Sequence, residues 1–243
     1  MRTPLVTSVV LAAAVTLAGC GGDPEPTSAT VETTAPATST APAEATVRRA
    51  VSAVSGALTV RRRPSADAAV LTRLPATTPL GSPRVLLVES VTEGWVRVAL
   101  PIRPNGSRGW VAADDVRLEP VSGKVLVDLT ARRLRYLVDG EEVVATPIAV
   151  GTRQNPTPTG RFYVTDRVKP EDPGGAYGVF ALGLSAHSDT LTEFGGGDGQ
   201  VGIHGTNESA SIGRAASHGC VRVPNKVAAV LTGVPLGTPV VVT

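Results

Sequence analysis

Cysteine and histidine are scarce in this sequence, which has two cysteines and three histidines among 243 residues. Cys20 lies in an N-terminal stretch with the features of an export signal, so Cys220 has no evident disulfide partner. A free thiol outside the cytosol is a chemical liability unless its reactivity is used. Cys220 is therefore the first candidate for a reactive residue.

The chain also has no excess of charge of one sign, with 23 Lys and Arg against 21 Asp and Glu. This balance implies no strongly electrostatic partner. Two short basic clusters, Arg61–Arg63 and Arg132–Arg133, have no aromatic residues between them. We interpret both clusters as solvated surface and expect no nucleic-acid partner.

Residues 1–20 are typical of a lipoprotein signal peptide. Arg2 provides a positive charge, and the stretch from Leu5 to Leu17 is apolar, uncharged and too short to favour a membrane-spanning helix. The run from Leu17 to Cys20 resembles the bacterial lipobox. That resemblance implies that Cys20 is lipidated and anchors an exported protein to the outer face of the bacterial cell membrane. An ordinary cleaved signal or an uncleaved anchor is the alternative.

Residues 21–49 are rich in Pro, Thr and Ala and have almost no large apolar side chains. Such a segment cannot bury enough surface to offset the entropy lost on ordering, so we expect a disordered tether. A tether here would hold the folded part away from the bilayer, and a tail without a spacing role is the alternative.

The rest of the sequence predicts two folded units, both mainly β. In residues 50–119, short strands such as Leu58–Arg61 and Trp95–Val98 are separated by turns, among them Asn105-Gly106. This pattern favours a small antiparallel barrel. The unit resembles the bacterial Src-homology-3-like domain, and that resemblance implies a module that accompanies wall enzymes in exported proteins and serves in binding or positioning.

Residues 121–243 predict a second, β-sandwich-like domain with little helix. Alternating residues over Val125–Thr130 and a hairpin turn at Asp139-Gly140 are typical of an antiparallel sheet. Near the end of the chain, we expect Asn225 to cap a short helix over residues 226–231.

Cys220 lies 16 residues after His204 in the sequence. His204 ends an apolar strand, and residues 207–216 are rich in Ser, Gly and Ala, as a loop returning toward that strand would be. An adjacent imidazole can supply the base that converts a thiol into a nucleophile. Gly219 permits the close main-chain approach that an oxyanion site requires. A buried, inert cysteine with surface histidines is the alternative.

These residues resemble the signature of the L,D-transpeptidase (YkuD-type) catalytic domain. The signature residues are His204-Gly205, Ser217-His218-Gly219-Cys220, Val221-Arg222 and Asn225. Two upstream blocks, Thr157–Tyr163 and Tyr177–Ser185, also resemble the family, so the likeness extends over residues 121–243.

The resemblance implies a role for each signature residue. Cys220 is the nucleophile, His204 is its base, and the carbonyl of Gly205 orients His204. His218, Gly219 and Cys220 help to form the oxyanion site, with a hydrogen bond from Ser217 nearby. Arg222 holds its loop or a substrate carboxylate, and Asn225 belongs to the substrate-binding set.

The implied activity is that of a peptidoglycan L,D-transpeptidase, an acyltransferase that needs no cofactor. Its partners are a donor tetrapeptide stem and an acceptor amine, which it joins in a 3→3 cross-link through a cysteine thioester. With water as acceptor it would be an L,D-carboxypeptidase that releases the terminal D-alanine.

Two other hypotheses compete with this one. A metal site could combine His204, His218 and Cys220 with His187, but a His-x-Cys spacing is not usual for zinc. His187 fits no motif, and we expect it on the surface. The protein could also be a non-catalytic wall-binding lipoprotein, a hypothesis that the paired His204 and Cys220 disfavour.

Overall fold

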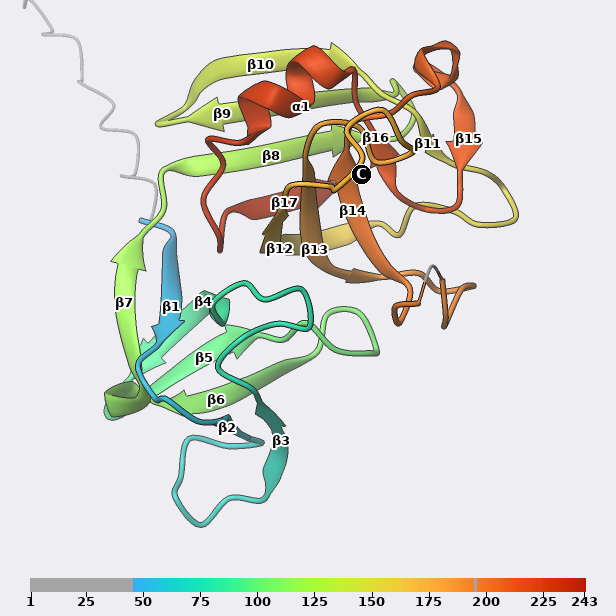
Figure 1. Ribbon diagram of the computed structural model, residues 1–243. Helices are drawn as coiled ribbons and strands as arrows, with labels where there is room; N and C mark the ends of the chain where they lie inside the picture. The colour runs from blue at the N-terminus through green and yellow to red at the C-terminus, as the bar shows by residue number, and fades with distance from the viewer. Residues whose placement is uncertain (1–45, 195) are drawn as a thin grey trace, which may run out of the picture. The chain divides into compact units, whose positions relative to one another are not determined.

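The computed structural model describes residues 46–194 and 196–243, which form mainly β strands (Figure 1). The signal peptide predicted for residues 1–20, the lipidation predicted at Cys20 and the tether as far as residue 45 lie outside the described residues. The described chain forms a seven-stranded sheet, an eight-stranded sheet and a two-stranded sheet.

The first sheet is antiparallel, with the strand order β3-β2-β6-β5-β4-β1-β7. Its strands are β1 (Arg48–Ser52), β2 (Leu58–Arg61), β3 (Val70–Leu74), β4 (Val85–Thr92), β5 (Trp95–Ala99), β6 (Arg108–Ala112) and β7 (Val116–Pro120). A 3-10 helix, Ala113–Asp115, precedes β7. Alternation along β5 turns Val96 and Val98 into the core of this sheet, where both are fully buried.

The first strand starts slightly before the predicted end of the tether. β1 begins at Arg48 because it pairs with both β4 and β7. Arg49, on this strand, also forms an ion pair with Glu119 at 2.8 Å.

The second sheet has the order β10-β9-β8-β17-β12-β13-β14-β16. Its strands are β8 (Gly123–Asp128), β9 (Arg133–Val138), β10 (Glu141–Pro147), β12 (Gly160–Val168), β13 (Ala181–His187), β14 (Gln200–His204), β16 (Val221–Arg222) and β17 (Pro239–Val242). β11 (Val150–Gly151) and β15 (Ala215–Ser217) pair separately. The eight strands form one continuous curled sheet (Figure 1), whereas a sandwich would have two facing sheets.

The predicted hairpin turn is present between β9 and β10. Asp139 and Gly140 both have positive φ, at 50° and 84°, which is the backbone conformation that a two-residue hairpin loop requires.

The predicted helix is also present, as α1 (Asn225–Leu231), but the prediction that Asn225 caps it is wrong. Pro224 occupies the cap position, and no side chain forms a capping bond. The Asn225 carboxamide is instead engaged with the main chain of Thr206. Ala228 and Leu231 on α1 pack into the core of the second sheet.

The two large sheets contact each other through buried polar groups as well as apolar ones. Tyr163 of β12 lies in the core of the first sheet, and its hydroxyl donates to the carbonyl of Ala99 at 3.3 Å. Asp166, which is 1% exposed, accepts hydrogen bonds from Thr78, in the connection between β3 and β4, and from Gln200 of β14. These contacts fix the first sheet against the strands that lead to His204.

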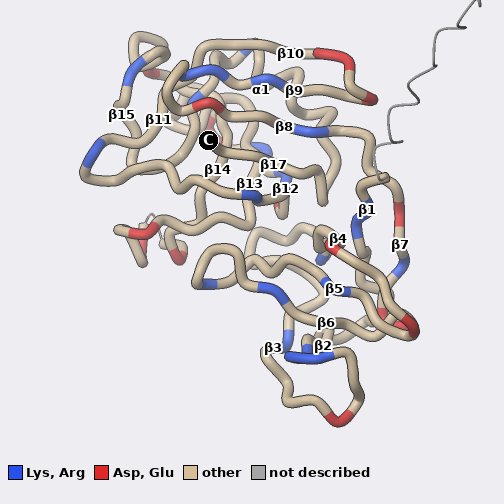
Figure 2. The backbone as a smooth tube through the Cα atoms, turned by 180° about the vertical axis from the view of Figure 1, so that it is seen from behind, with Lys and Arg blue, Asp and Glu red and all other residues tan. Residues whose placement is uncertain are grey.

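Basic and acidic residues are interspersed along the described chain (Figure 2), in keeping with its balanced composition. Over the described residues, the structure contains no helix with the length and apolar character of a membrane span.

Truncation of the core should destabilise the second sheet. Leu134 in β9 is fully buried, so Leu134→Ala should lower the free energy of unfolding by about 2–5 kcal/mol. Val143 in the neighbouring β10 is 52% exposed, and Val143→Ala should change it by less than about 0.5 kcal/mol. Urea denaturation of the two variants measures both values, and equal losses would contradict this assignment of the core.

Candidate active site

The pairing of β14 with β16 places His204 and Cys220 on one face of the sheet. The strands are parallel, with Ile203 opposite Val221 and His204 opposite Arg222. Ile203 and Val221 are buried in the core, at 1% and 0% exposure. Because side chains alternate between faces, His204, Cys220 and Arg222 project to the opposite side. The backbone N–H of Gly202 confirms this register by donating to Cys220 Sγ at 3.4 Å.

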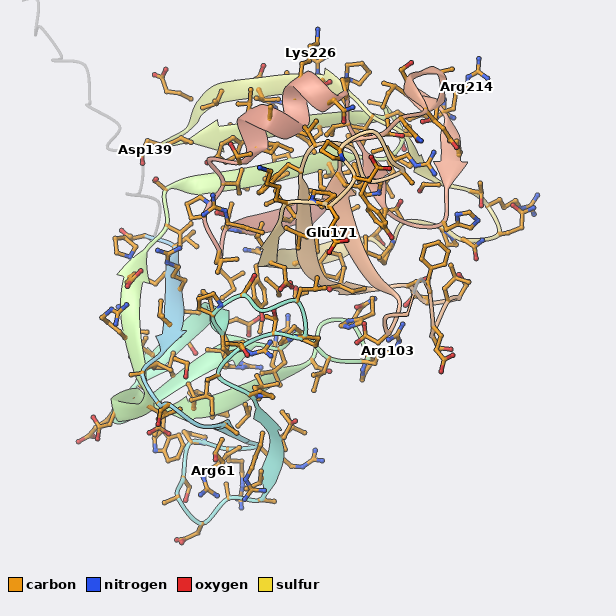
Figure 3. The ribbon with its side chains drawn as sticks, in the orientation of Figure 1. Arg61, Arg103, Asp139, Glu171, Arg214 and Lys226 are labelled. Atoms are coloured by element: carbon orange, nitrogen blue, oxygen red, sulfur yellow. The ribbon has the colours of Figure 1, made fainter. Side chains whose placement is uncertain are left out.

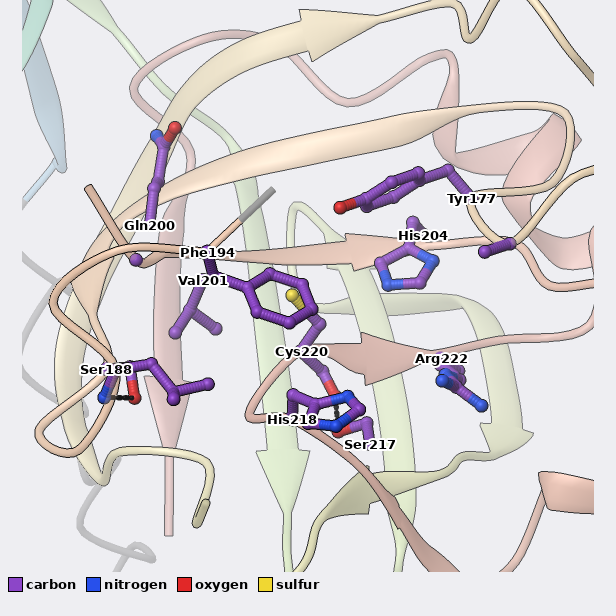
Figure 4. A pocket seen from close by; sticks show the side chains of 13 residues that line it. Tyr177, Ser188, Phe194, Gln200, Val201, His204, Ser217, His218, Cys220 and Arg222 are labelled. Atoms are coloured by element: carbon purple, nitrogen blue, oxygen red, sulfur yellow. Dashed lines mark hydrogen bonds between the residues drawn. The ribbon is translucent and has the colours of Figure 1, made fainter. Parts of the chain in front are cut away.

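On that side lies a cavity of about 310 Å³. The side chains of His204, Cys220, Tyr177 and His218 converge on it (Figure 4). The other residues that line it are Ala176, Ser188, Leu191, Phe194, Gly199, Gln200, Val201, Ser217 and Arg222. The thiol and the imidazole that the sequence paired therefore share one pocket.

The orientation of the His204 ring is set by its own main chain. Its Nδ1 lies 2.6 Å from the carbonyl oxygen of Gly205, the contact that the family resemblance implied. A carbonyl only accepts, so Nδ1 carries the proton and Nε2 is left as the basic nitrogen. The ring of Tyr177 packs against the imidazole, with the ring centroids 4.8 Å apart.

Asn225 holds the turn that follows His204. Its Oδ1 accepts from the N–H of Thr206 at 3.0 Å, and its Nδ2 donates to the carbonyl of Thr206 at 3.1 Å. Gly178 and Gly205 both lie so close to Asn225 Oδ1 that a Cβ at either position would collide with it. Asn225 is not among the residues that line the pocket, and its predicted contact with substrate stays a prediction.

Ser217 shapes the turn that carries the thiol. Ser217 is buried. Its hydroxyl donates to the carbonyl of Cys220 at 2.5 Å and accepts from the N–H of Gly219 at 3.1 Å. Gly219 has a φ of +119°, a conformation that side chains disfavour. The N–H of Gly219 is thus bonded to Ser217. The role predicted for Gly219 in the oxyanion site stays a prediction.

Burial keeps both reactive groups uncharged at neutral pH. Burial lowers the pKa of His204 to about 4, with a smaller contribution from the charge of Arg222, while the Gly205 hydrogen bond opposes the shift. Burial raises the pKa of Cys220 above its usual value, although the Gly202 amide and Arg222 oppose this. The resting pair is therefore a thiol and a neutral imidazole.

Arg222 lies at the edge of the pocket with its side chain 13% exposed. Its Nη1 forms an ion pair with Glu208 Oε2 at 2.5 Å, and Glu208 belongs to the loop between His204 and Cys220. The Nε of Arg222 is buried without a hydrogen-bond partner. The side chain is thus placed to hold its loop, and it still presents a positive charge to the pocket.

One wall of the pocket was not apparent from the sequence. Leu191 and Phe194 come from the segment between β13 and β14, and the Phe194 ring lies 5.2 Å from that of His218. This segment is rich in Gly and polar residues and has no hydrophobic periodicity that would mark it as part of a site.

The prediction that His187 lies on the surface is wrong. The residue is 5% exposed, and its Nε2 lies 3.0 Å from Asp198 Oδ2. In the part of the chain that the structure describes, no three or more His, Cys, Asp or Glu side chains are arranged to hold a metal ion.

A curled β sheet with an oriented imidazole and a free thiol in one pocket is the arrangement found here, and comparison with known proteins places it in a family. Residues 122–242 match the family model described as the L,D-transpeptidase catalytic domain, YkuD. The Bacillus subtilis (strain 168) protein YkuD, named as an L,D-transpeptidase, is 38% identical over 119 residues, which are 49% of this chain and 64% of that protein. YqjB of the same organism, named likewise, is 32% identical over 133 residues, which are 49% of this chain and 70% of that protein.

Among solved structures, an L,D-transpeptidase from Enterococcus faecium is 27% identical and aligns with a TM-score of 0.40 over 50% of each chain. The chain covers 64% of the length of the Bacillus subtilis YkuD protein and 65% of its Bacillus licheniformis counterpart. The protein belongs to the L,D-transpeptidase family, and its YkuD-type catalytic domain contains the pocket described above.

The lowered pKa of His204 should make folding stability depend on pH. Between its ordinary pKa of 6.5 and about 4, the unfolded chain binds a proton that the folded chain excludes. The free energy of unfolding therefore keeps its full value above pH 6.5. It should fall by up to about 3 kcal/mol as the pH decreases toward 4. Urea denaturation of wild type and of His204→Gln across this pH range measures how much of the pH dependence of the free energy of unfolding comes from His204. If the free energy of unfolding depended on pH equally in both proteins, the lowered pKa assigned to His204 would be wrong.

Proposed function

We propose that this protein is a peptidoglycan L,D-transpeptidase that forms 3→3 cross-links through a thioester on Cys220. Membership of the family supports action on peptidoglycan stem peptides. The observation that carries the proposal is the shared pocket, which Cys220 lines together with an imidazole whose Nδ1 is already bonded to Gly205. Only Nε2 of that imidazole is left to take a proton.

In the first half-reaction, Cys220 Sγ attacks the carbonyl carbon of the third residue of a tetrapeptide stem. His204 Nε2 accepts the thiol proton as the S–C bond forms, because both groups start uncharged. The tetrahedral oxyanion then collapses, the bond to the terminal D-alanine breaks, and its nitrogen leaves with the proton from His204. A thioester between Cys220 and the shortened stem remains.

In the second half-reaction, an amine of a neighbouring stem attacks the thioester carbonyl. His204 Nε2 takes a proton from the attacking amine and returns it to the departing sulfur, which regenerates the thiol. Water in place of the amine would give a tripeptide stem, and the reaction would then be that of a carboxypeptidase.

Arg222 has the position and the charge to favour both half-reactions. Its positive charge opposes the burial that raises the pKa of Cys220, so it favours the ionised sulfur that attacks and departs. The ion pair with Glu208 holds the guanidinium at the pocket edge, where a substrate carboxylate would meet it.

We further propose that the enzyme acts outside the membrane as a lipoprotein. The lipobox-like run ending at Cys20 supports lipidation, and the Pro- and Thr-rich residues that follow support a flexible tether. The strand and turn pattern of residues 50–119 supports a Src-homology-3-like module that works beside the catalytic domain.

Removal of the thiol tests the proposed chemistry. Cys220→Ala should abolish release of D-alanine from a purified tetrapeptide stem and all cross-linked product, since no other group in the pocket replaces the nucleophile. Mass spectrometry of the products identifies the 3→3 dimer or the tripeptide, and trapped thioester should add the acyl mass to wild type only. Unchanged release by the variant would reject the proposal, and tripeptide alone would favour the carboxypeptidase.

Loss of the Asn225 carboxamide should impair catalysis without unfolding the protein. Asn225→Ala frees the Thr206 backbone and so allows Gly205 and the His204 ring to shift, which should lower kcat by about 10²-fold with a smaller change in KM. Lys226→Ala, at the next and exposed position of α1, is the matched control. If the two variants had equal kcat values, Asn225 would have no positioning role.

A further inference from the structure

The loop between β5 and β6 of the first sheet is bonded to the pocket wall of the second. We call residues 188–194 and 196–199, between β13 and β14, the wall segment, because Leu191 and Phe194 within it line the pocket. Two side chains of the β5–β6 loop, Arg103 and Asn105, reach this segment, Arg103 at Asp198 and Asn105 at Asp189. Figure 3 shows Arg103 at the border of its sheet nearest the catalytic domain.

Asn105 fixes the point at which β13 ends and the wall segment begins. Its Nδ2 donates to the carbonyl of His187 at 2.7 Å, and its Oδ1 accepts from the N–H of His187 at 2.9 Å. The carboxamide thus bonds to both main-chain groups of the last residue of β13, as a neighbouring strand would.

Arg103 joins the start of the wall segment to its end. Its Nη2 donates to the carbonyls of Ser188 and Leu191 at 2.9 and 3.1 Å, and its Nη1 donates to the carbonyl of Asp198 at 2.7 Å. The planar guanidinium fixes the relative directions of these donors, which a lysine ammonium does not.

The close packing around Gly199 leaves the end of the segment little freedom. A Cβ at this position would collide with the carbonyl of Leu191 and lie 3.0 Å from Arg103 Nη2, and the φ of Gly199 is +77°. The two ends of the wall segment and the guanidinium therefore meet at one point.

The catalytic domain contributes bonds of its own to the segment. Thr190 Oγ1 donates to Asn155 Oδ1 at 3.1 Å, and Ser188 Oγ accepts from the N–H of Leu191 at 3.0 Å. These bonds engage the first residues of the segment, and two more join its ends: His187 Nε2 lies 3.0 Å from Asp198 Oδ2, and the N–H of Ser188 donates to the carbonyl of Gly199 at 2.9 Å. Arg103 is the side chain that bonds to Asp198 as well as to Leu191, so it spans the stretch that carries Phe194.

We propose that Arg103 and Asn105 are positioning residues for the donor stem peptide. They hold the wall segment so that Leu191 and Phe194 form the side of the pocket against which the peptide binds. Neither residue touches the thiol or the imidazole, so they act on binding and not on the chemical step. This inference rests on the proposed function, and it gives the first sheet a direct part in substrate selection.

Steady-state kinetics of the full chain with a purified tetrapeptide stem test the proposal. Arg103→Ala should raise KM about 10-fold with kcat nearly unchanged, because it removes binding that the ground state and the transition state share. Arg103→Lys should give an intermediate KM, since it keeps the charge without the planar fork. Arg97→Ala, an exposed position on β5 of the same sheet, is the matched control and should retain the KM of wild type.

A double-mutant cycle with Leu191→Ala distinguishes positioning of the wall segment by Arg103 from a general stabilisation of the contact between the two sheets. If Arg103 acts through the wall, Arg103→Ala should raise KM less in the Leu191→Ala background than in wild type. Additive effects on KM would overturn the proposal.

Hydrogen exchange gives a readout that does not depend on turnover. Arg103→Ala should speed exchange of the Leu191 amide and its neighbours in the wall segment by about 10-fold or more, with β8 and β9 unaffected and Arg97→Ala without effect. Should wild type fail to turn over the stem peptide, the proposed function fails, and this exchange pattern still decides the role of Arg103. If Arg103→Ala exchanged the amides of the wall segment at the wild-type rate, or if its exchange rates rose uniformly across both sheets, the inference would be overturned. Arg103→Lys replaces Arg103→Ala if the latter does not fold.

Discussion

The parallel pairing of β14 with β16 is the constraint on which the rest of the site depends. These two short strands turn Ile203 and Val221 into the core, so His204 and Cys220 must project together on the other face. A slip of one residue would send the thiol into the core and Val221 into the pocket. The surrounding contacts stabilise this register. Ser217 donates a hydrogen bond to the carbonyl of Cys220 in the turn before β16, and Arg222 of β16 forms a β-bridge with Ala149. The position of the nucleophile is thus a property of the main chain.

The electrostatics of the pocket follow from the same burial. A thiol and an imidazole that were both exposed could exchange a proton freely and form a charged pair in water. Here the loss of hydration at His204 and at the Cys220 thiol shifts the two pKa values in opposite directions, each toward the neutral form. Arg222 shifts both pKa values downward, so it favours an ionised thiol and a neutral imidazole. Proton transfer and attack on a carbonyl are therefore naturally coupled in time.

Much of this site could be predicted from the sequence because its key residues are near one another in the chain. His204 ends β14 and Cys220 directly precedes β16, its neighbour in the sheet, and the motif spacing of these residues carries that information. Leu191, Phe194 and Arg103 could not be found in this way, since the hydrogen bonds from Arg103 to the wall segment join residues about 85 to 95 positions apart and follow no periodicity. Asn225 and His187 were misjudged for the same reason: the partners that define them, Thr206 and Asn105, are set by tertiary packing.

The neutral thiol has a consequence beyond the acyl transfer. Peroxides and small disulfides react with thiolates far faster than with protonated sulfur. A cysteine whose pKa is raised by burial is thus spared from oxidation during the intervals when no substrate is bound. The burial that makes Cys220 depend on His204 for each attack would also lengthen the working life of the Cys220 sulfur.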